Sequence, residues 1–224
     1  MSLYNTTMPT THPFRIVVLA STNGTDLQAI IDEMKAGKMP GIELTAVISN
    51  KKDCYALKRA REQGYKTIHV SEYVQSREEF DTHLIEAIDA FSPDLICLVG
   101  YMRILTPPLV RHYKARNTPI INVHPSLIPK FCGRSFFGKT VHEAVLAAHE
   151  KETGMTIHLV DEGVDTGKIL IQERVSVTPN DTPETLKEKV VALEKKYYPE
   201  IIRQLATSKN ISQHSERAAR KLFE

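Results

Sequence analysis

The residues best suited to catalysis lie in the segment INVHPS, which closes an apolar run. Asn122 and His124 are two positions apart, so in a strand their side chains point to the same face. They also stand at the carboxyl end of that run, directly before Pro125. An amide beside an imidazole can hold a developing oxyanion and move a proton. The alternative is a structural pair whose side chains bond to neighbouring backbone groups.

A second candidate is the acidic loop DEGVDTG, residues 161–167, which follows another apolar run. Its carboxylates are Asp161, Glu162 and Asp165. A carboxylate facing His124 would raise the pKa of the imidazole and hold it protonated. The alternative is a solvated acidic turn. His158, in the middle of the preceding run, is interpreted as a packed residue of a strand.

A turn reading STNGTD, residues 21–26, follows the first apolar run of the chain and precedes a helical pattern. A glycine-containing turn at a helix N-terminus offers free N–H groups and a positive dipole end, which suit a phosphate. The residues concerned are Gly24, Thr25 and Asp26. The alternative is an ordinary turn in which Thr25 or Asp26 caps the helix.

Two further places carry side chains that could contact a ligand. The segment YMRIL follows the apolar run 94–99, and its apolar side chains and arginine could line a slot for a flat aromatic ligand. Core packing is the alternative for Met102, Arg103, Ile104 and Leu105. Glu194 stands in the last long helical pattern, where a glutamate is usually solvated.

The segment GRSFFGKT, residues 133–140, fits the nucleotide-binding pattern G-x-x-x-x-G-K-[ST]. A working phosphate loop needs a strand directly before its first glycine, whereas here the nearest run ends near His124 and two prolines intervene. The strand-ending acid in IHLVD is the one feature that favours a nucleotide site. We interpret 133–140 as a mobile loop at the mouth of the active site, with hinge freedom at Gly133 and Gly138.

These residues must be positioned by elements that alternate between strand and helix. Apolar, β-branched runs predict strands at 15–21, 42–49, 67–70, 94–99, 120–124, 155–160 and 168–177. Helical spacing predicts helices at 25–35, 55–63, 76–91, 107–113, 139–149 and 183–206. The alternation predicts an α/β fold, a doubly wound, mostly parallel sheet with helices on both faces. Ligands then bind beyond the carboxyl ends of the strands.

Composition limits the classes of function. The chain has 224 residues, 42% of them hydrophobic, and a net charge of only +2, which does not favour nucleic-acid binding. We expect one domain at 15–206, a disordered leader at 1–14 and a polar tail at 207–224. Three widely spaced cysteines without C-x-x-C spacing indicate free thiols in a reducing, cytoplasmic compartment rather than a metal site. No apolar run is long enough to span a membrane.

Taken together, these segments resemble the folate-dependent formyltransferase family from about Arg15 to Gln204. The resemblance rests on VVLASTNGTDLQAIID, LVGYMRIL, INVHPSLIPKF, GMTIHLVDEGVDTGKILIQ and the helical E-x-x-Y-Y-P. The pairing of N-x-H-P-S-L-x-P with D-x-x-D-x-G is specific to the family. The turn at 21–26 and Glu194 narrow the resemblance to members that formylate glycinamide ribonucleotide.

The resemblance implies an activity and a role for each matching residue. The activity is transfer of a formyl group from 10-formyltetrahydrofolate, a cosubstrate, to the amine of 5-phosphoribosylglycinamide. The implied catalytic residues are Asn122, His124 and Asp165. The implied substrate-binding residues are Gly24, Thr25 and Asp26 for the phosphate and Glu194 for the glycinamide end. The implied folate-binding residues are Arg77, Met102, Arg103, Ile104, Leu105, Asn122 and Asp161.

The resemblance also leaves alternatives open. The family turn usually reads S-G-x-G-S-N, whereas this chain has S-T-N-G-T-D and so places Asp26 beside the implied phosphate. Another folate-using enzyme, a 10-formyltetrahydrofolate hydrolase or a tRNA formyltransferase, is the alternative function. A nucleotide-binding protein using 133–140 is a more distant one. We expect small-molecule substrates only, no nucleic acid, membrane or metal, and a monomer or homodimer.

Overall fold

The computed structural model describes the backbone of residues 12–221 and the side chains of 12–209, so the expected leader at 1–14 lies almost entirely outside the described residues. Its centre is a seven-stranded sheet in the order β3-β2-β1-β4-β5-β6-β7. The strands are β1 (Phe14–Ala20), β2 (Ile42–Ser49), β3 (Thr67–His69), β4 (Leu95–Val99), β5 (Ile120–His124), β6 (Glu152–Leu159) and β7 (Ile169–Ser176). The first five of this order pair in parallel, and β6 and β7 pair antiparallel. The predicted doubly wound, mostly parallel sheet is confirmed.

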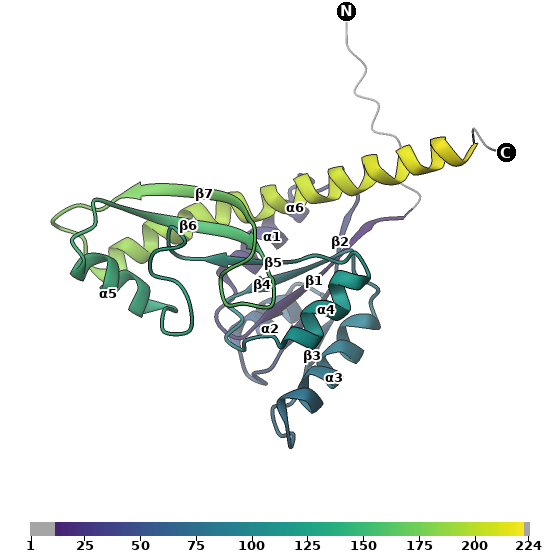
Figure 1. The fold of residues 1–224 in the computed structure, drawn as a ribbon, viewed down its shortest axis with the longest axis horizontal. Helices are drawn as coiled ribbons and strands as arrows, with labels where there is room; N and C mark the ends of the chain where they lie inside the picture. The colour runs from purple at the N-terminus through teal and green to yellow at the C-terminus, as the bar shows by residue number, and fades with distance from the viewer. Residues whose placement is uncertain (1–11, 222–224) are drawn as a thin grey trace, which may run out of the picture.

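Helices cover both faces of the sheet (Figure 1). They are α1 (Thr25–Lys35), α2 (Tyr55–Glu62), α3 (Arg77–Asp89), α4 (Pro107–Ala115), α5 (Lys139–Ala147) and α6 (Pro183–Lys221). The side chains of β1 alternate between the two resulting cores. Ile16 and Val18 pack with α1, α2 and α6, whereas Val17 and Leu19 pack with α3 and α4. This alternation is the period of two that a strand buried on both faces requires.

The last helix differs from its predicted extent. Helical backbone continues from Pro183 to Lys221, beyond the expected end at Ala206. The inward side of its first half is buried through Leu186, Val190, Tyr198 and Ile202. In Figure 1 its second half projects past the sheet.

The order of the strands creates one crevice. Because β1 lies between β2 and β4, the connections leaving the carboxyl ends of β1 and β4 go to opposite faces of the sheet. Ser21 ties these two exits together, since its hydroxyl accepts from the backbone N–H of Met102 at 2.9 Å and donates to Asn50 at 2.6 Å. The turn at 21–26 and the YMRIL segment at 101–105 therefore lie next to each other, as the fold prediction requires.

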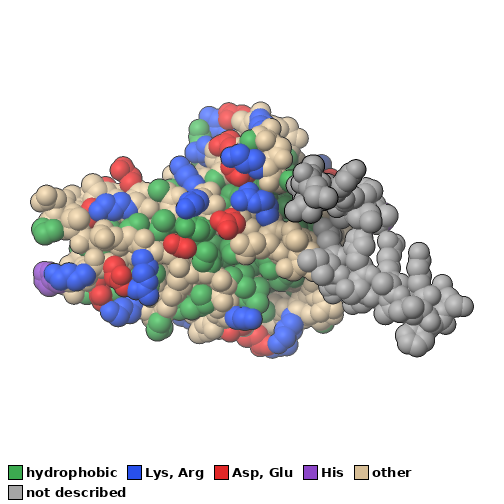
Figure 2. Space-filling view, turned by 90° about the horizontal axis from the view of Figure 1, so that it is seen from above, with side chains coloured by type: hydrophobic (Ala, Val, Ile, Leu, Met, Phe, Trp, Pro, Cys, Tyr) green, Lys and Arg blue, Asp and Glu red, His purple; other side chains and the backbone are tan. Residues whose placement is uncertain are grey.

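The surface carries both signs of charge. On the face in Figure 2, lysine, arginine and acidic side chains are interspersed around apolar patches, in keeping with the net charge of +2. Within 12–221, no helix is long and apolar enough to cross a membrane.

Candidate active site

The INVHPS pair lies where the sequence placed it, at the carboxyl end of β5. His124 is buried, with 5% of its surface exposed, and Asn122 is half-buried. The antiparallel neighbour β6 sets His158 directly opposite Asn122. The Asn122 Nδ2 atom lies 3.3 Å from the Nε2 atom of His158. A polar cluster therefore forms across two neighbouring strands.

Asp165 completes this cluster from the loop between β6 and β7. It adopts a left-handed conformation with φ of 57°, which turns its carboxylate back toward the sheet. One oxygen lies 3.6 Å from His124 Nδ1, and the other lies 3.6 Å from His158 Nε2. The backbone N–H of Gly133 donates to the same carboxylate at 2.9 Å. The structure thus brings together the three predicted catalytic residues and adds His158.

The electrostatics of His124 differ from the expectation. Burial lowers the pKa of the imidazole, and the charge of Asp165 and the carbonyl of Phe131 only partly offset this effect. The net pKa is below the ordinary value, so the prediction that Asp165 holds His124 protonated is wrong for the unliganded protein. Desolvation of a cation outweighs one carboxylate at 3.6 Å.

The carboxylate of Asp165 remains charged in spite of its burial. Burial alone would raise its pKa, but the polar contact with His158 at 3.6 Å, the charge of His124 and the N–H of Gly133 together outweigh this effect and lower it. His158 is therefore a partner of the Asp165 carboxylate, and its interpretation as a packed, hydrogen-bonded residue of a strand did not identify this partner. Only the pairing register of β5 with β6 could have revealed it, because Asn122 and His158 are 36 residues apart.

The segment after β5 contacts the cluster but does not form a nucleotide loop. His124 Nε2 lies 2.8 Å from the carbonyl oxygen of Phe131, and Gly133 contacts Asp165 as described. No strand leads directly into Gly133, because β5 ends nine residues earlier at His124. Lys139, the residue that would hold a phosphate, instead pairs with Glu184 at 2.8 Å. The loop at 133–140 thus adjoins the active site, as predicted, and its hinge role stays a prediction.

The turn after β1 has the backbone that an anion site requires. Gly24 is left-handed, with φ of 65°, and immediately precedes helix α1. A side chain at this position would bring its Cβ within 2.7 Å of the Cβ of Ala56. No side chain caps the helix, so the expected alternative of a Thr25 or Asp26 cap is wrong. The first N–H groups of α1 therefore stay free for a ligand.

Asp26 and Glu194 are buried, which neither sequence pattern predicted. Their exposed fractions are 5% and 7%, so the expectation of a solvated Glu194 is wrong. Burial raises the pKa of Asp26 to about 7, opposed by the charge of Lys195. Burial and then the charge of Asp26 raise the pKa of Glu194 well above its ordinary value. The charge of Asp26 therefore affects the pKa of Glu194 across the packed interface of α1 and α6.

The residues assigned to a flat ligand line a small pocket beside the cluster. Its volume is about 110 Å³, and its walls include Leu98, Tyr101, Met102, Arg103, Ile104, Leu105, Asn122, His158, Val160, Asp161 and Asp165. Arg77 adjoins this pocket, since its guanidinium donates to the carbonyl of Ile104 at 2.8 Å. The guanidinium carbon of Arg103 lies 3.9 Å from the centroid of the Phe80 ring, which holds this charged group in place. The implied folate residues and Asn122 thus share one hollow.

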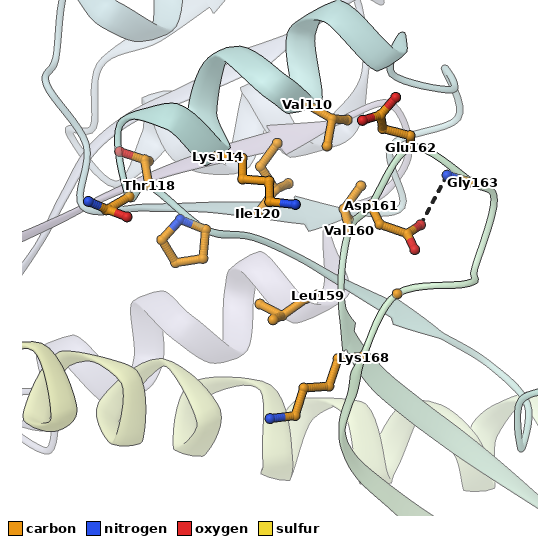
Figure 3. Close-up of a pocket in the computed structure, with 13 residues that line it drawn as sticks. Val110, Lys114, Thr118, Ile120, Leu159, Val160, Asp161, Glu162, Gly163 and Lys168 are labelled. Carbon is orange, nitrogen blue, oxygen red and sulfur yellow. Dashed lines mark hydrogen bonds between the residues drawn. The ribbon is translucent and has the colours of Figure 1, made fainter.

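A larger cavity lies on the other side of the acidic loop (Figure 3). It has a volume of about 690 Å³ and is lined by α4, the start of β5 and residues 159–168. Val160, Asp161 and Gly163 line both hollows. Asp161 holds the loop in this position by accepting from Gly163 N–H at 3.0 Å and from Thr166 at 2.6 Å. A thin wall of loop therefore separates the two spaces.

Comparisons with known proteins agree with this geometry. The family model described as formyl transferase matches residues 14–202. The phosphoribosylglycinamide formyltransferase of Escherichia coli strain K12 is 39% identical over 188 residues, which are 84% of each chain. A trifunctional purine biosynthetic protein of Bos taurus is 40% identical over 194 residues, but the match spans only 18% of that longer protein.

Solved structures give the same result. The phosphoribosylglycinamide formyltransferase of Coxiella burnetii superposes with a TM-score of 0.79 at 45% identity, covering 88% of this chain and 89% of that one. Glycinamide ribonucleotide transformylase 1 of Symbiobacterium toebii superposes with a TM-score of 0.81 at 39% identity, covering 89% and 90%.

Proposed function

Because this chain belongs to the formyl transferase family, we propose that it transfers the formyl group of 10-formyltetrahydrofolate to the amine of 5-phosphoribosylglycinamide. One observation carries the proposal. The buried cluster of Asn122, His124 and Asp165 shares one end of the sheet with a turn suited to phosphate and a hollow suited to a flat ring. A phosphorylated amine and a folate can thus meet at the cluster.

The chemistry follows from the charges of the cluster. The substrate amine attacks the formyl carbon, a C–N bond forms, and the formyl oxygen becomes an oxyanion. The amide of Asn122 donates to that oxygen, and His124 supplies the second hydrogen bond when its Nε2–H turns from the carbonyl of Phe131 to the oxyanion. His124 is neutral in the unliganded site, so it can accept the proton that the attacking nitrogen loses, and the developing negative charge stabilises the imidazolium that results.

Asp165 completes the proton transfer. Its carboxylate faces Nδ1 of His124, so it stabilises the imidazolium as that charge appears. The attacking nitrogen loses a proton, the bond between the formyl carbon and N10 breaks, and N10 of the departing folate gains a proton. A carboxylate that stays charged in a buried site also orders the water that carries this proton.

The two substrates are held on either side of the cluster. The phosphate binds the free N–H groups at Gly24, Thr25 and Asp26, and Glu194 contacts the glycinamide end of the same molecule. The folate ring lies against Met102, Arg103, Ile104, Leu105 and Asp161, with Arg77 at the edge. Both partners are small molecules, and the enzyme acts in the cytoplasm, where its cysteines persist as thiols.

The decisive test is a transfer assay with both substrates. We expect formylated ribonucleotide and tetrahydrofolate in equal amounts when both substrates are saturating. A reaction without the amine should release almost no formate, because the site needs the amine as its nucleophile. Formate release at the same rate with and without the amine would replace this proposal by a hydrolase, and no product in either reaction would reject it.

A further inference from the structure

The carboxyl group of Asp26 has an unusual environment. It belongs to the first turn of α1, yet it is 95% shielded from solvent and its Oδ1 atom has no hydrogen-bond partner within the described residues. It does not cap the helix, whose first residue follows Gly24 without a side-chain cap. An ionised carboxylate left in this state would lose its hydration without compensation.

Glu194 reaches the same region from α6. It is 7% exposed, and the charges of Asp26 and Glu194 both act on the buried hydroxyl of Tyr198. The other groups that face the pair are Lys187 and Lys195 of α6, His142 of α5 beyond Lys187, and Cys97 of β4 beyond Tyr198. No side-chain hydrogen bond to either lysine reaches Asp26 or Glu194 in the part of the chain described. Two buried carboxyl groups on packed helices therefore influence each other's ionisation, and neither has a bonded counter-ion among the described residues.

This arrangement conflicts with a doubly ionised pair. Asp26 follows Thr25 in the turn whose N–H groups would hold the substrate phosphate, so a negative Asp26 would repel that phosphate through a weakly screened interior. Like charges on Glu194 and Asp26 would also repel each other. A proton on Asp26 removes both conflicts, while leaving the backbone donors of the turn available.

We propose that Asp26 and Glu194 act as one charge-coupled carboxyl pair behind the phosphate-binding turn, and that Asp26 keeps its proton, and so stays uncharged, while the ribonucleotide binds. The inference rests on the proposed function. Asp26 is then a positioning residue that acts through charge, and the affinity for the ribonucleotide decreases as pH rises and Asp26 loses its proton. The substitution Asp26→Asn keeps the shape of the side chain and fixes it in the uncharged state.

The experiment compares KM for 5-phosphoribosylglycinamide in wild type and Asp26→Asn from pH 6 to pH 8.5. The ratio of the two KM values cancels titration of the substrate itself. We expect a ratio near one at pH 6 and about fivefold or more at pH 8.5, with the wild type weaker, as expected for one added charge near a phosphate. The matched control is Asp32→Asn, which removes an exposed carboxylate of the same helix and should leave the ratio near one throughout.

A second measurement tests the pair without turnover. Carboxyl groups whose folded-state pKa is raised bind more protons folded than unfolded, so they lower stability as pH rises from about 4 to the folded-state pKa. The Tm of the wild type should therefore decline between pH 5 and 8 by about 3 °C more than that of Asp26→Asn. Glu194→Gln should reduce the decline in the same way, which covers the case in which Asp26→Asn folds poorly.

The outcomes separate this inference from the proposed function. Turnover by the wild type with a KM ratio that does not change with pH overturns the pair and leaves the enzyme assignment intact. A Tm decline identical in wild type, Asp26→Asn and Glu194→Gln also overturns it. Absence of turnover by the wild type rejects the proposed function, and the Tm comparison then decides on the pair alone, whereas a pH-dependent ratio together with the altered Tm decline supports the pair.

Discussion

The two polar centres of this protein are built in opposite ways. At the β5–β6 centre, His124, His158 and Asp165 meet one another, and each ring or carboxylate has at least one partner within 3.6 Å. At the α1–α6 centre, Asp26 keeps an unpartnered oxygen and no ion pair reaches Glu194 among the described residues. The first centre is thus organised before any ligand binds, as oxyanion stabilisation requires. The second centre leaves polar groups for the substrate to satisfy.

The largest effect should come from removing the imidazole of the organised centre. His124→Ala deletes one of the two proposed donors to the oxyanion, so kcat should fall by about 10³-fold. Binding of the ribonucleotide, measured by calorimetry, should change by less than about twofold, because the α1–α6 centre is intact. The exposed histidine His83, replaced by Ala, serves as the control and should not alter kcat. Equal losses in kcat and in ribonucleotide affinity would mean that the two centres are not separable.

A smaller effect is expected at the turn of the second centre. Gly24→Ala forces a Cβ to within 2.7 Å of Ala56 and strains a backbone at φ of 65°. Ribonucleotide KM should rise about 10-fold or more, and the free energy of unfolding should drop by about 2–3 kcal/mol. The urea midpoint and the initial-rate KM measure the two effects.

A matched glycine isolates the steric part of this effect. Gly64 also has a positive φ, of 83°, but a Cβ there would meet nothing within 4 Å. Gly64→Ala should therefore cost only about 1 kcal/mol of backbone strain and leave KM unchanged. If the two variants had the same KM, the close approach of the turn to Ala56 would have no role in binding.

The two centres also differ in how far the sequence predicted them. Asn122 and His124 follow from the period of two in one strand, whereas Asp165 was singled out from the three acids of its loop only by the resemblance to the family. His158 did not follow, because its role depends on a register between strands distant in sequence. The burial of Asp26 and Glu194 did not follow either, since a helical acid is normally solvated and only the packing of α1 on α6 buries it.

The same reasoning explains why the nucleotide-binding pattern at 133–140 was misleading. Its letters match a nucleotide pattern, but the pattern contains no information about the strand that must precede it. The fold was predictable because strand and helix periodicity are local properties of the chain. The net pKa of His124 was not, because it is set by desolvation, which depends on the whole surrounding structure.

Replacing His158 tests whether the β5–β6 centre needs this imidazole to keep Asp165 charged. His158→Asn keeps a polar side chain but removes the imidazole contact that lowers the pKa of Asp165. The carboxylate should then be protonated at a higher pH, so the acid limb of the kcat profile should move upward in pH. We expect kcat at neutral pH to fall by about tenfold. An unchanged acid limb, recorded from pH 5 to 8 at saturating substrates, would assign His158 to packing alone.

The smallest effect should come from the residue that links the two centres. Tyr198 is fully buried, and its hydroxyl lies 2.9 Å from the carbonyl of Leu98 and 3.3 Å from that of Ile121, joining α6 to β4 and β5. Tyr198→Phe leaves those carbonyls without this donor, so the free energy of unfolding should fall by about 1–2 kcal/mol. The exposed Tyr73, replaced by Phe, should unfold at the wild-type urea concentration. Because Tyr198 touches neither proposed substrate, kcat and both KM values should stay within about twofold of wild type. A tenfold change in kcat or in either KM would contradict this prediction. It would show that the alignment of α6 with β5 couples the β5–β6 centre to the α1–α6 centre.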